Sequence, residues 1–286
     1  MRTLSLAFIL FSAFAIAQTN TEVYLFDLKK VEGKFELSNQ RNISNNEGYD
    51  NQPSFYNDNI VLFSSTRNGQ TDIAKYNIRD SGMGYINDTP DGSEYSPTKI
   101  PNKKEISSIR LDKDGKQLLY SYDYKTGKSK VLVPDLVIGY HVWADKDRIV
   151  SFVLGDISSL VVSNLKDKSN HTFQKNIGRS LHRIPNSQLV SYISKESQDW
   201  EIRSLDPISG TTKKIINTIP EAEDMCWIID GTILMAKDKT IYKFNIKTDK
   251  DWGILKTFKN KEINNITRIV TNETGNYLAL VAEVSP

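Results

Sequence analysis

A short motif recurs along this 286-residue chain at intervals of about 40 to 50 residues. In each copy a run of apolar or small residues ends at Asp or Asn, and a turn rich in Gly or Lys often follows. The marked positions are Asp27, Asn77, Asp123, Asn164, Asp206 and Asn245. Asp and Asn suit the end of a strand, because their side chains accept hydrogen bonds from the amides of the next turn. Repeats of this length with several strands each predict the blades of a β-propeller.

The region 50–78 shows the content of one repeat. Apolar runs at 60–63 and 73–76 are bounded by turns at 57–59 and 67–69, which contain Asn, Asp and Gly. Such short runs are typical of antiparallel hairpins rather than helices. A sheet of this size is not stable alone, so neighbouring copies must cover both of its faces.

The order of the strands predicts how the ring closes. Pairs of first and second strands are expected at 53–65, 97–111, 141–153, 181–193, 225–236 and 267–282. The motif at Asp27 precedes all of these pairs, and no motif follows the last one. If residues 23–38 supply the outer strands for 267–282, six complete blades result and no sheet edge stays unpaired. The predicted fold class is therefore all-β: a six-bladed β-propeller closed by pairing of N-terminal strands with the C-terminal blade.

The predicted organisation is a signal peptide, residues 1–17, followed by one propeller, residues 18–286. Outer strands of the last blade are expected at 18–45 and its inner strands at 263–286. The five blades between them are expected at 46–90, 91–137, 138–178, 179–220 and 221–262.

Residues 1–17 have the pattern of a secretory signal peptide. Arg2 gives a positive start, an apolar run covers 4–16, and residues 15–17 form a small-x-small cleavage site. The run is too short to span a membrane, so no transmembrane segment is expected. Cys226 is the only cysteine, which leaves no internal disulfide and no lipid-anchoring cysteine after the cleavage site. The expected location is the bacterial periplasm or the cell exterior.

One repeat combines the run GYDNQPSF at 48–55 with the strand at 60–65, Asn68-Gly69 and Asp72-Ile73. This combination resembles the repeat of TolB-type propellers, and the resemblance extends over essentially the whole chain after the signal peptide. It implies a TolB-like six-bladed propeller of a secreted bacterial type. TolB proteins also have an N-terminal α/β domain that contacts the Tol-Pal machinery. Residues 18–46 are too few to form such a domain.

Charge and motifs argue against several function classes. The 37 Lys and Arg residues nearly balance 35 Asp and Glu, whereas nucleic-acid-binding proteins usually present a far more basic face. The pairs Ser64-Ser65 and Ser107-Ser108 lack the Gly-x-Ser-x-Gly context of a serine hydrolase. No phosphate-binding loop or zinc-finger spacing occurs. We therefore predict no catalytic residue and expect a monomer that does not bind nucleic acid.

The residues just before each inner strand are expected to gather at one mouth of the central channel. Those that we predict to bind a ligand there are Asp50, Glu94, His141, His182, Asp224 and Arg268. Mixed acids and bases around a narrow channel favour a polar or charged ligand. The histidines predict binding that changes between about pH 5 and 8. The expected partner is an envelope protein or a small polar ligand.

Three functions agree with this pattern. A ligand- or protein-binding module is the favoured interpretation, and no metal or cofactor is predicted for it. The alternative is a hydrolase or lactonase that depends on a channel calcium ion, for which Glu94, Asp224, Asn264 and Asn265 would imitate the oxygen ligands of six-bladed enzymes. A purely structural envelope protein is the third.

Overall fold

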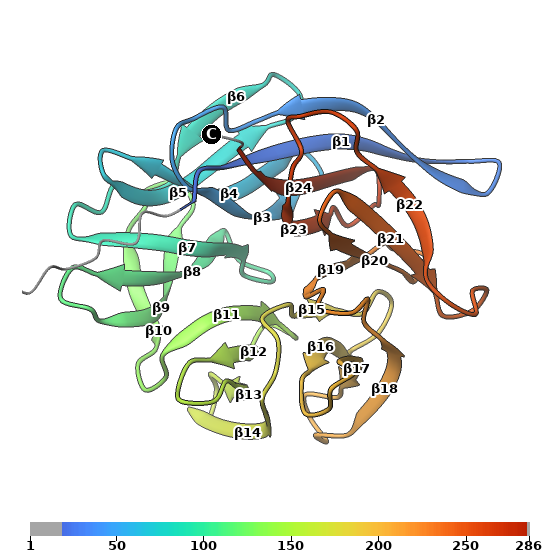
Figure 1. Cartoon of the computed structure of the whole chain (residues 1–286). Coiled ribbons are helices and arrows are strands. Elements are labelled where there is room, and N and C mark those ends of the chain that lie inside the picture. The colour runs from blue at the N-terminus through green and yellow to red at the C-terminus, as the bar shows by residue number, and fades with distance from the viewer. Residues whose placement is uncertain (1–18, 285–286) are drawn as a thin grey trace, which may run out of the picture.

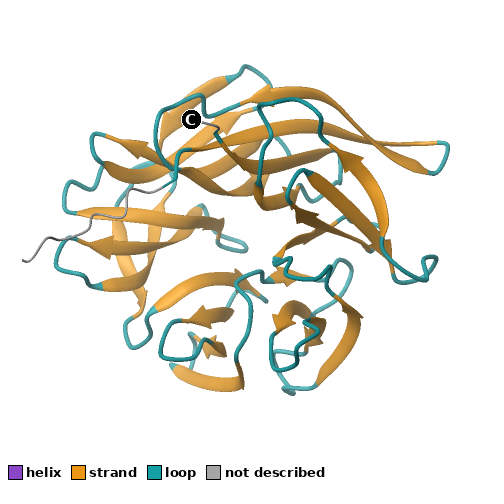
Figure 2. Ribbon diagram, viewed as in Figure 1, coloured by secondary structure: helices purple, strands orange, loops and turns teal. Residues whose placement is uncertain are grey.

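The structure is a computed structural model that describes residues 19–284. Those residues form strands and turns, with no helix among them (Figures 1 and 2). The strands make six four-stranded antiparallel sheets arranged in a ring, which confirms the predicted six-bladed propeller. The predicted signal peptide lies outside the described residues.

Each of blades 1 to 5 uses four consecutive strands, the first nearest the centre of the ring. Blades 1 to 3 consist of β3 (Asp50–Asn57), β4 (Ile60–Arg67), β5 (Gln70–Asn77), β6 (Gly82–Tyr85), β7 (Gly92–Lys99), β8 (Glu105–Asp112), β9 (Gln117–Asp123), β10 (Ser129–Val133), β11 (Ile138–Trp143), β12 (Arg148–Val153), β13 (Ser159–Asn164) and β14 (Ser169–Lys175). Blades 4 and 5 consist of β15 (His182–Arg183), β16 (Val190–Ser194), β17 (Glu201–Leu205), β18 (Thr212–Asn217), β19 (Asp224–Trp227), β20 (Thr232–Lys237), β21 (Thr240–Asn245) and β22 (Gly253–Thr257).

Blade 6 joins the two ends of the described chain. Its strand order is β2-β1-β24-β23, where β1 (Thr21–Val31) and β2 (Lys34–Asn42) come first in the sequence and β23 (Ile266–Thr271) and β24 (Tyr277–Glu283) come last. The register between β1 and β24 runs from Thr21 opposite Glu283 to Asp27 opposite Tyr277. This antiparallel pairing confirms the predicted ring closure.

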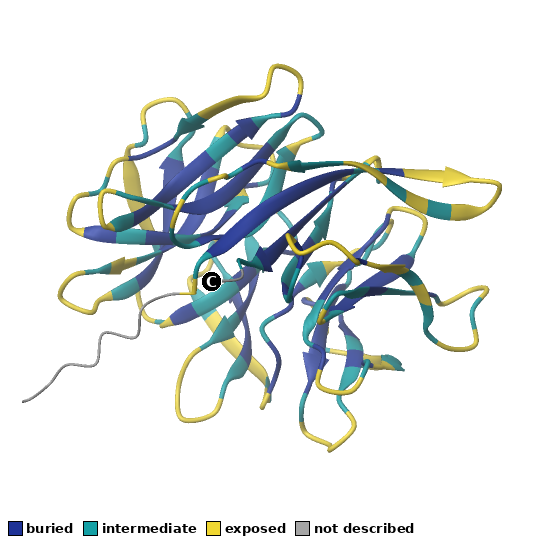
Figure 3. Ribbon diagram, turned by 45° about the horizontal axis from the view of Figure 1, so that its top comes forward, coloured by how far each residue is buried: buried dark blue, intermediate teal, exposed yellow. Residues whose placement is uncertain are grey.

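The core lies between neighbouring blades, and β1 shows why. Its side chains alternate between two apolar clusters: Val23 and Leu25 pack with Phe63 in blade 1, whereas Tyr24 packs with Leu234 in blade 5. Successive side chains of a strand point to opposite faces, so a sheet covered on both faces needs a nearly continuous apolar run. Exposed residues concentrate in the turns and in the β1–β2 hairpin (Figure 3).

Candidate functional site

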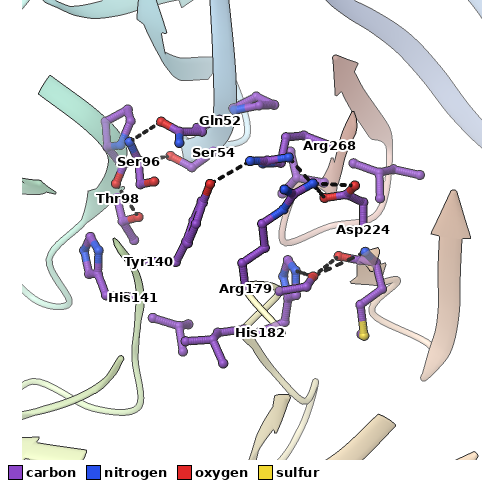
Figure 4. Close-up of a pocket in the computed structure, with 18 residues that line it drawn as sticks. Gln52, Ser54, Ser96, Thr98, Tyr140, His141, Arg179, His182, Asp224 and Arg268 are labelled. Atoms are coloured by element: carbon purple, nitrogen blue, oxygen red, sulfur yellow. Dashed lines mark hydrogen bonds and ion pairs between the residues drawn. The ribbon is translucent and has the colours of Figure 1, made fainter. Parts of the chain in front are cut away.

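A cavity of about 180 Å³ lies where the inner strands converge, and we call it the channel cavity. Every blade contributes a short segment to its lining: 52–54, 96–98, 140–142, 179–182, 224–225 and 268–270 (Figure 4). Residues far apart in the sequence meet there because each blade places its first strand nearest the centre of the ring.

Two of the six segments have the same local distortion. The pairing of β3 with β4 shifts between Asn51 and Ser54, and the pairing of β7 with β8 shifts between Tyr95 and Thr98. At each bulge the residue before a proline has a positive φ, 55° at Gln52 and 52° at Ser96. Positive φ is uncommon for residues other than glycine, and bulges often redirect side chains next to functional sites.

The charged centre of the cavity consists of two arginines that share one carboxylate. Arg179 Nη2 lies 3.1 Å from Asp224 Oδ2, and Arg268 Nη1 lies 3.3 Å from Asp224 Oδ1. Arg268 also donates a hydrogen bond from Nη2 to the Tyr140 hydroxyl, at 2.8 Å. Figure 4 shows the two guanidinium groups beside Asp224, with Tyr140 on the other side of Arg268.

This cluster has at least one positive charge in excess. Burial raises the pKa of Asp224, and Arg268 and Arg179 counteract that rise. Burial lowers the pKa of Arg179, but the nearby Asp224, Tyr140 and Glu223 together outweigh this effect and the pKa is raised. Glu223, next to the cluster, is neutralised by Lys195 at 3.2 Å. Two guanidinium groups therefore face a single carboxylate.

Solved structures with a similar fold include a putative TolB from Agrobacterium tumefaciens. It has a TM-score of 0.72 and 10% sequence identity, and the match covers 94% of this chain and 100% of that chain. TolB from Acinetobacter baumannii has a TM-score of 0.56 and 9% identity, over 92% of this chain and 64% of that one. This chain has the fold of a TolB-like propeller.

An oligogalacturonate lyase in complex with manganese is also similar, with a TM-score of 0.60 and 12% identity over 94% of this chain and 99% of that one. No protein-family model and no curated protein matches the sequence. These identities establish the fold alone, so the function of this TolB-like propeller must be argued from its own residues.

Both predicted histidines line the channel cavity, but they do not titrate in the expected range. Burial lowers the pKa of His141 to about 4, and it also lowers the pKa of His182 to about 4, where a hydrogen bond with the Met225 backbone partly opposes it. Both rings are therefore neutral between pH 5 and 8. The pH dependence expected from the sequence does not follow from these histidines.

Asp224 and Arg268 also line the cavity, whereas Asp50 and Glu94 are absent from its lining. Asp50 is fully buried at the start of β3, and its backbone carbonyl accepts a hydrogen bond from the Thr21 hydroxyl of the closing strand at 3.0 Å. Glu94 is fully buried and accepts hydrogen bonds from Tyr122, at 2.7 Å, and Asn87, at 2.7 Å. Both acids pack inside the protein rather than at the mouth, and each precedes the bulge of its strand.

Sequence reasoning missed Arg179. It precedes β15, which contains two residues, and it follows Gly178 without any motif. The only signal in the sequence is its position just before an inner strand, one residue before Ser180. Arg179 and Arg268 both pair with Asp224, which requires blades 4, 5 and 6 to be placed together in the ring.

The two carboxylates proposed for a channel calcium, Glu94 and Asp224, are both engaged by other side chains. Glu94 is held by Tyr122 and Asn87, and Asp224 is bound by two arginines. Positive guanidinium groups on a carboxylate oppose the binding of a cation. Within residues 19–284 no group of three or more His, Cys, Asp or Glu side chains is placed to hold a metal ion.

Proposed function

We propose that this TolB-like propeller is a binding module that holds a carboxylate group of its ligand in the channel cavity. The observation that supports this is the pair Arg179 and Arg268, which share the single carboxylate of Asp224. Guanidinium groups present a planar set of donors that matches a carboxylate. Arg179 Nε is buried and has no hydrogen-bond partner among the described residues, so one donor of this guanidinium group is unsatisfied within the described protein.

The size of the cavity limits what can enter. Pockets that enclose drug-sized ligands are usually larger than about 300 Å³, whereas this cavity measures about 180 Å³. The ligand part that fits is therefore a small acid or the acidic end of a longer chain. A free metabolite and the C-terminus of an envelope protein supply the same carboxylate chemistry.

Calorimetric titration separates these two sources. One arm uses acetate with acetamide as its neutral counterpart. The other uses a short peptide with a free C-terminal carboxylate and the same peptide with an amidated C-terminus. We expect the acid of at least one pair to bind and its amide to bind at least tenfold more weakly, because a charge-assisted hydrogen bond contributes more than a neutral one.

Arg179→Gln and Arg268→Gln should each weaken acid binding about tenfold or more. Arg203→Gln is the matched control, because Arg203 is equally charged but pairs with Glu201 at 2.6 Å away from the cavity. Equal affinity for acid and amide, or equal losses in all three variants, would overturn the proposal.

We also propose that the protein is exported, on the signal-peptide pattern of residues 1–17. Residues 19–284 contain no helix with the length and apolar character needed to cross a membrane. Intact mass of the protein from its native host should show a mature chain that begins at Gln18. A full-length product that stays bound to the membrane would contradict export.

A further inference from the structure

We infer that the ligand is a hydroxy acid, because the channel cavity combines the arginine pair with two neutral polar side chains that each have one buried atom without a hydrogen-bond partner. This inference rests on the proposed carboxylate site and adds the chemical class of the ligand. The two groups are Ser96 and His141, from blades 2 and 3, and both side chains line the cavity.

Both side chains are more than nine-tenths buried: Ser96 is 8% exposed and His141 is 7% exposed. Ser96 Oγ and His141 Nδ1 form no hydrogen bond with any described residue. Buried polar atoms nearly always have a partner, so each unsatisfied one needs an explanation. A ligand or water in the cavity would supply it.

The contacts of Ser107 indicate which nitrogen of His141 carries the proton. Ser107 Oγ accepts a hydrogen bond from Trp143 Nε1 at 2.8 Å, and it lies 2.7 Å from His141 Nε2 and 3.2 Å from the Thr98 carbonyl. A hydroxyl has one hydrogen and two lone pairs. All three are used if Ser107 donates to Thr98 and accepts from Trp143 and from a protonated His141 Nε2. Nδ1 is then a bare acceptor.

A neutral imidazole nitrogen and a serine hydroxyl match a hydroxyl group better than an ammonium group. A buried ammonium requires an opposite charge, and Asp224, the only carboxylate among the described lining residues, is already bound by two arginines. The cavity thus offers three features that a hydroxy acid would use: positive charge from the arginines, a hydrogen-bond acceptor from His141 and a hydroxyl group from Ser96.

Two further tyrosines lie near the channel cavity without lining it. Tyr49 and Tyr95 contact each other edge to face, with 6.0 Å between ring centroids. The pKa of Tyr49 is raised, mainly by burial and to a smaller extent by the nearby Tyr140. Tyrosine rings combine an apolar face with a polar hydroxyl. Tyr140 lines the cavity itself. A polyhydroxy acid has the same mixture of C–H and O–H groups as this ring, so aldonic and uronic acids are the members of the class that suit the cavity.

Three six-carbon probes test the inference by calorimetry on the whole mature protein. Gluconate has a carboxylate and hydroxyls, hexanoate has only the carboxylate, and sorbitol has only the hydroxyls. We expect gluconate to bind at least tenfold more tightly than hexanoate, and sorbitol to bind most weakly.

The outcomes separate this inference from the function on which it rests. Equal binding of gluconate and hexanoate would show that water alone satisfies Ser96 and His141, which overturns the hydroxy-acid class and leaves carboxylate binding intact. Binding of sorbitol as tight as that of gluconate would contradict the carboxylate site itself. Failure of all three probes would overturn the inference as stated, whereas the peptide titration above would still decide the proposed function.

Ser96→Ala and His141→Gln should each reduce the preference for gluconate over hexanoate severalfold, with a larger loss of affinity for gluconate than for hexanoate. Ser108→Ala is the matched control, because Ser108 is a fully buried serine outside the cavity that donates to the Tyr95 carbonyl at 2.7 Å. The nitrogen NMR signals of His141 should show an unprotonated Nδ1 that shifts on addition of gluconate. A protonated Nδ1, or an unchanged preference in both variants, would overturn the inference.

Discussion

Asp50 is a buried carboxylate whose negative charge is poorly stabilised by the residues around it. It is fully buried, and neither carboxylate oxygen forms a hydrogen bond with a described residue. Burial raises its pKa to about 7, Glu22 adds to the rise, and the nearby Ser65 and Asn46 oppose it without forming a hydrogen bond to it. Asp50 therefore matters for stability rather than for the ligand.

Asp50→Asn should stabilise the protein above neutral pH. The pKa of an unfolded Asp is about 4, so between about pH 4 and 7 the folded state holds a proton that the unfolded state releases. Stability therefore falls as pH rises through that window, and the neutral amide avoids this loss. We expect roughly 2 to 4 kcal/mol more stability than wild type at pH 8 and no difference at pH 4.

Urea unfolding at both pH values measures this effect. Asp91→Asn is the control, since the Asp91 side chain is 89% exposed. An Asp50→Asn variant that is less stable than wild type at pH 8 would contradict this prediction, because it would show that the ionised carboxylate is stabilised by a partner.

The neutral histidines lead to a second prediction at this scale. Because burial lowers the pKa values of His141 and His182 to about 4, affinity for a carboxylate ligand should change less than twofold between pH 5 and 8. Titrations at pH 5, 6, 7 and 8 test this. A step near pH 6.5 that disappears in His141→Gln would mean that this ring is more solvated than its burial indicates.

At the scale of single elements, β1 is the strand on which the ring depends. It pairs with β24 on one edge and β2 on the other, and its faces pack against blades 1 and 5. Deleting residues 23–38 should abolish cooperative unfolding, because it removes both outer strands of blade 6 and leaves β24 with an unpaired edge. A deletion protein that melts cooperatively at the wild-type temperature would contradict this closure.

A milder substitution measures the contribution of β1 without removing it. Leu25→Ala should destabilise the protein by about 3 kcal/mol, because Leu25 is fully buried against blade 1. Leu37→Ala in β2 is the matched control and should cost about 1 kcal/mol or less, since Leu37 is only partly buried. Similar losses at the two positions would show that β1 has no special part in closure.

At the scale of the whole molecule, the ring brings the two ends of the described chain together. The Val284 amide donates to the Asn20 carbonyl at 3.0 Å, next to the Thr21–Glu283 pair. A circular permutant, in which a short linker joins these two ends and the chain starts at the Asn68–Gly69 turn, should keep the fold, because every strand pair is retained. Circular dichroism and thermal unfolding test this. Loss of cooperative unfolding in the permuted protein would show that β1 must be made before blade 1.

The blade count, the strand order and the closure could all be predicted from the sequence. Each blade buries both faces against its neighbours, so its strands appear as apolar runs, and the turns between them need Asn, Asp or Gly. These are local requirements. The half-blades around Asp27 and at 267–282 then leave six-bladed closure as the arrangement without an open edge.

Only the tertiary structure determined which polar residues share the channel cavity. His141, His182, Asp224 and Arg268 lie along its lining, but position before an inner strand did not distinguish them from Asp50 and Glu94, which pack away from it. A shift of one residue in a strand moves a side chain to the opposite face, and bulges at Gln52 and Ser96 introduce such shifts.

The charge of the site depends on Arg179, Asp224 and Arg268 from three blades, and the neutral state of its histidines depends on burial. Both are properties of packing between distant segments, which no local pattern in the sequence records.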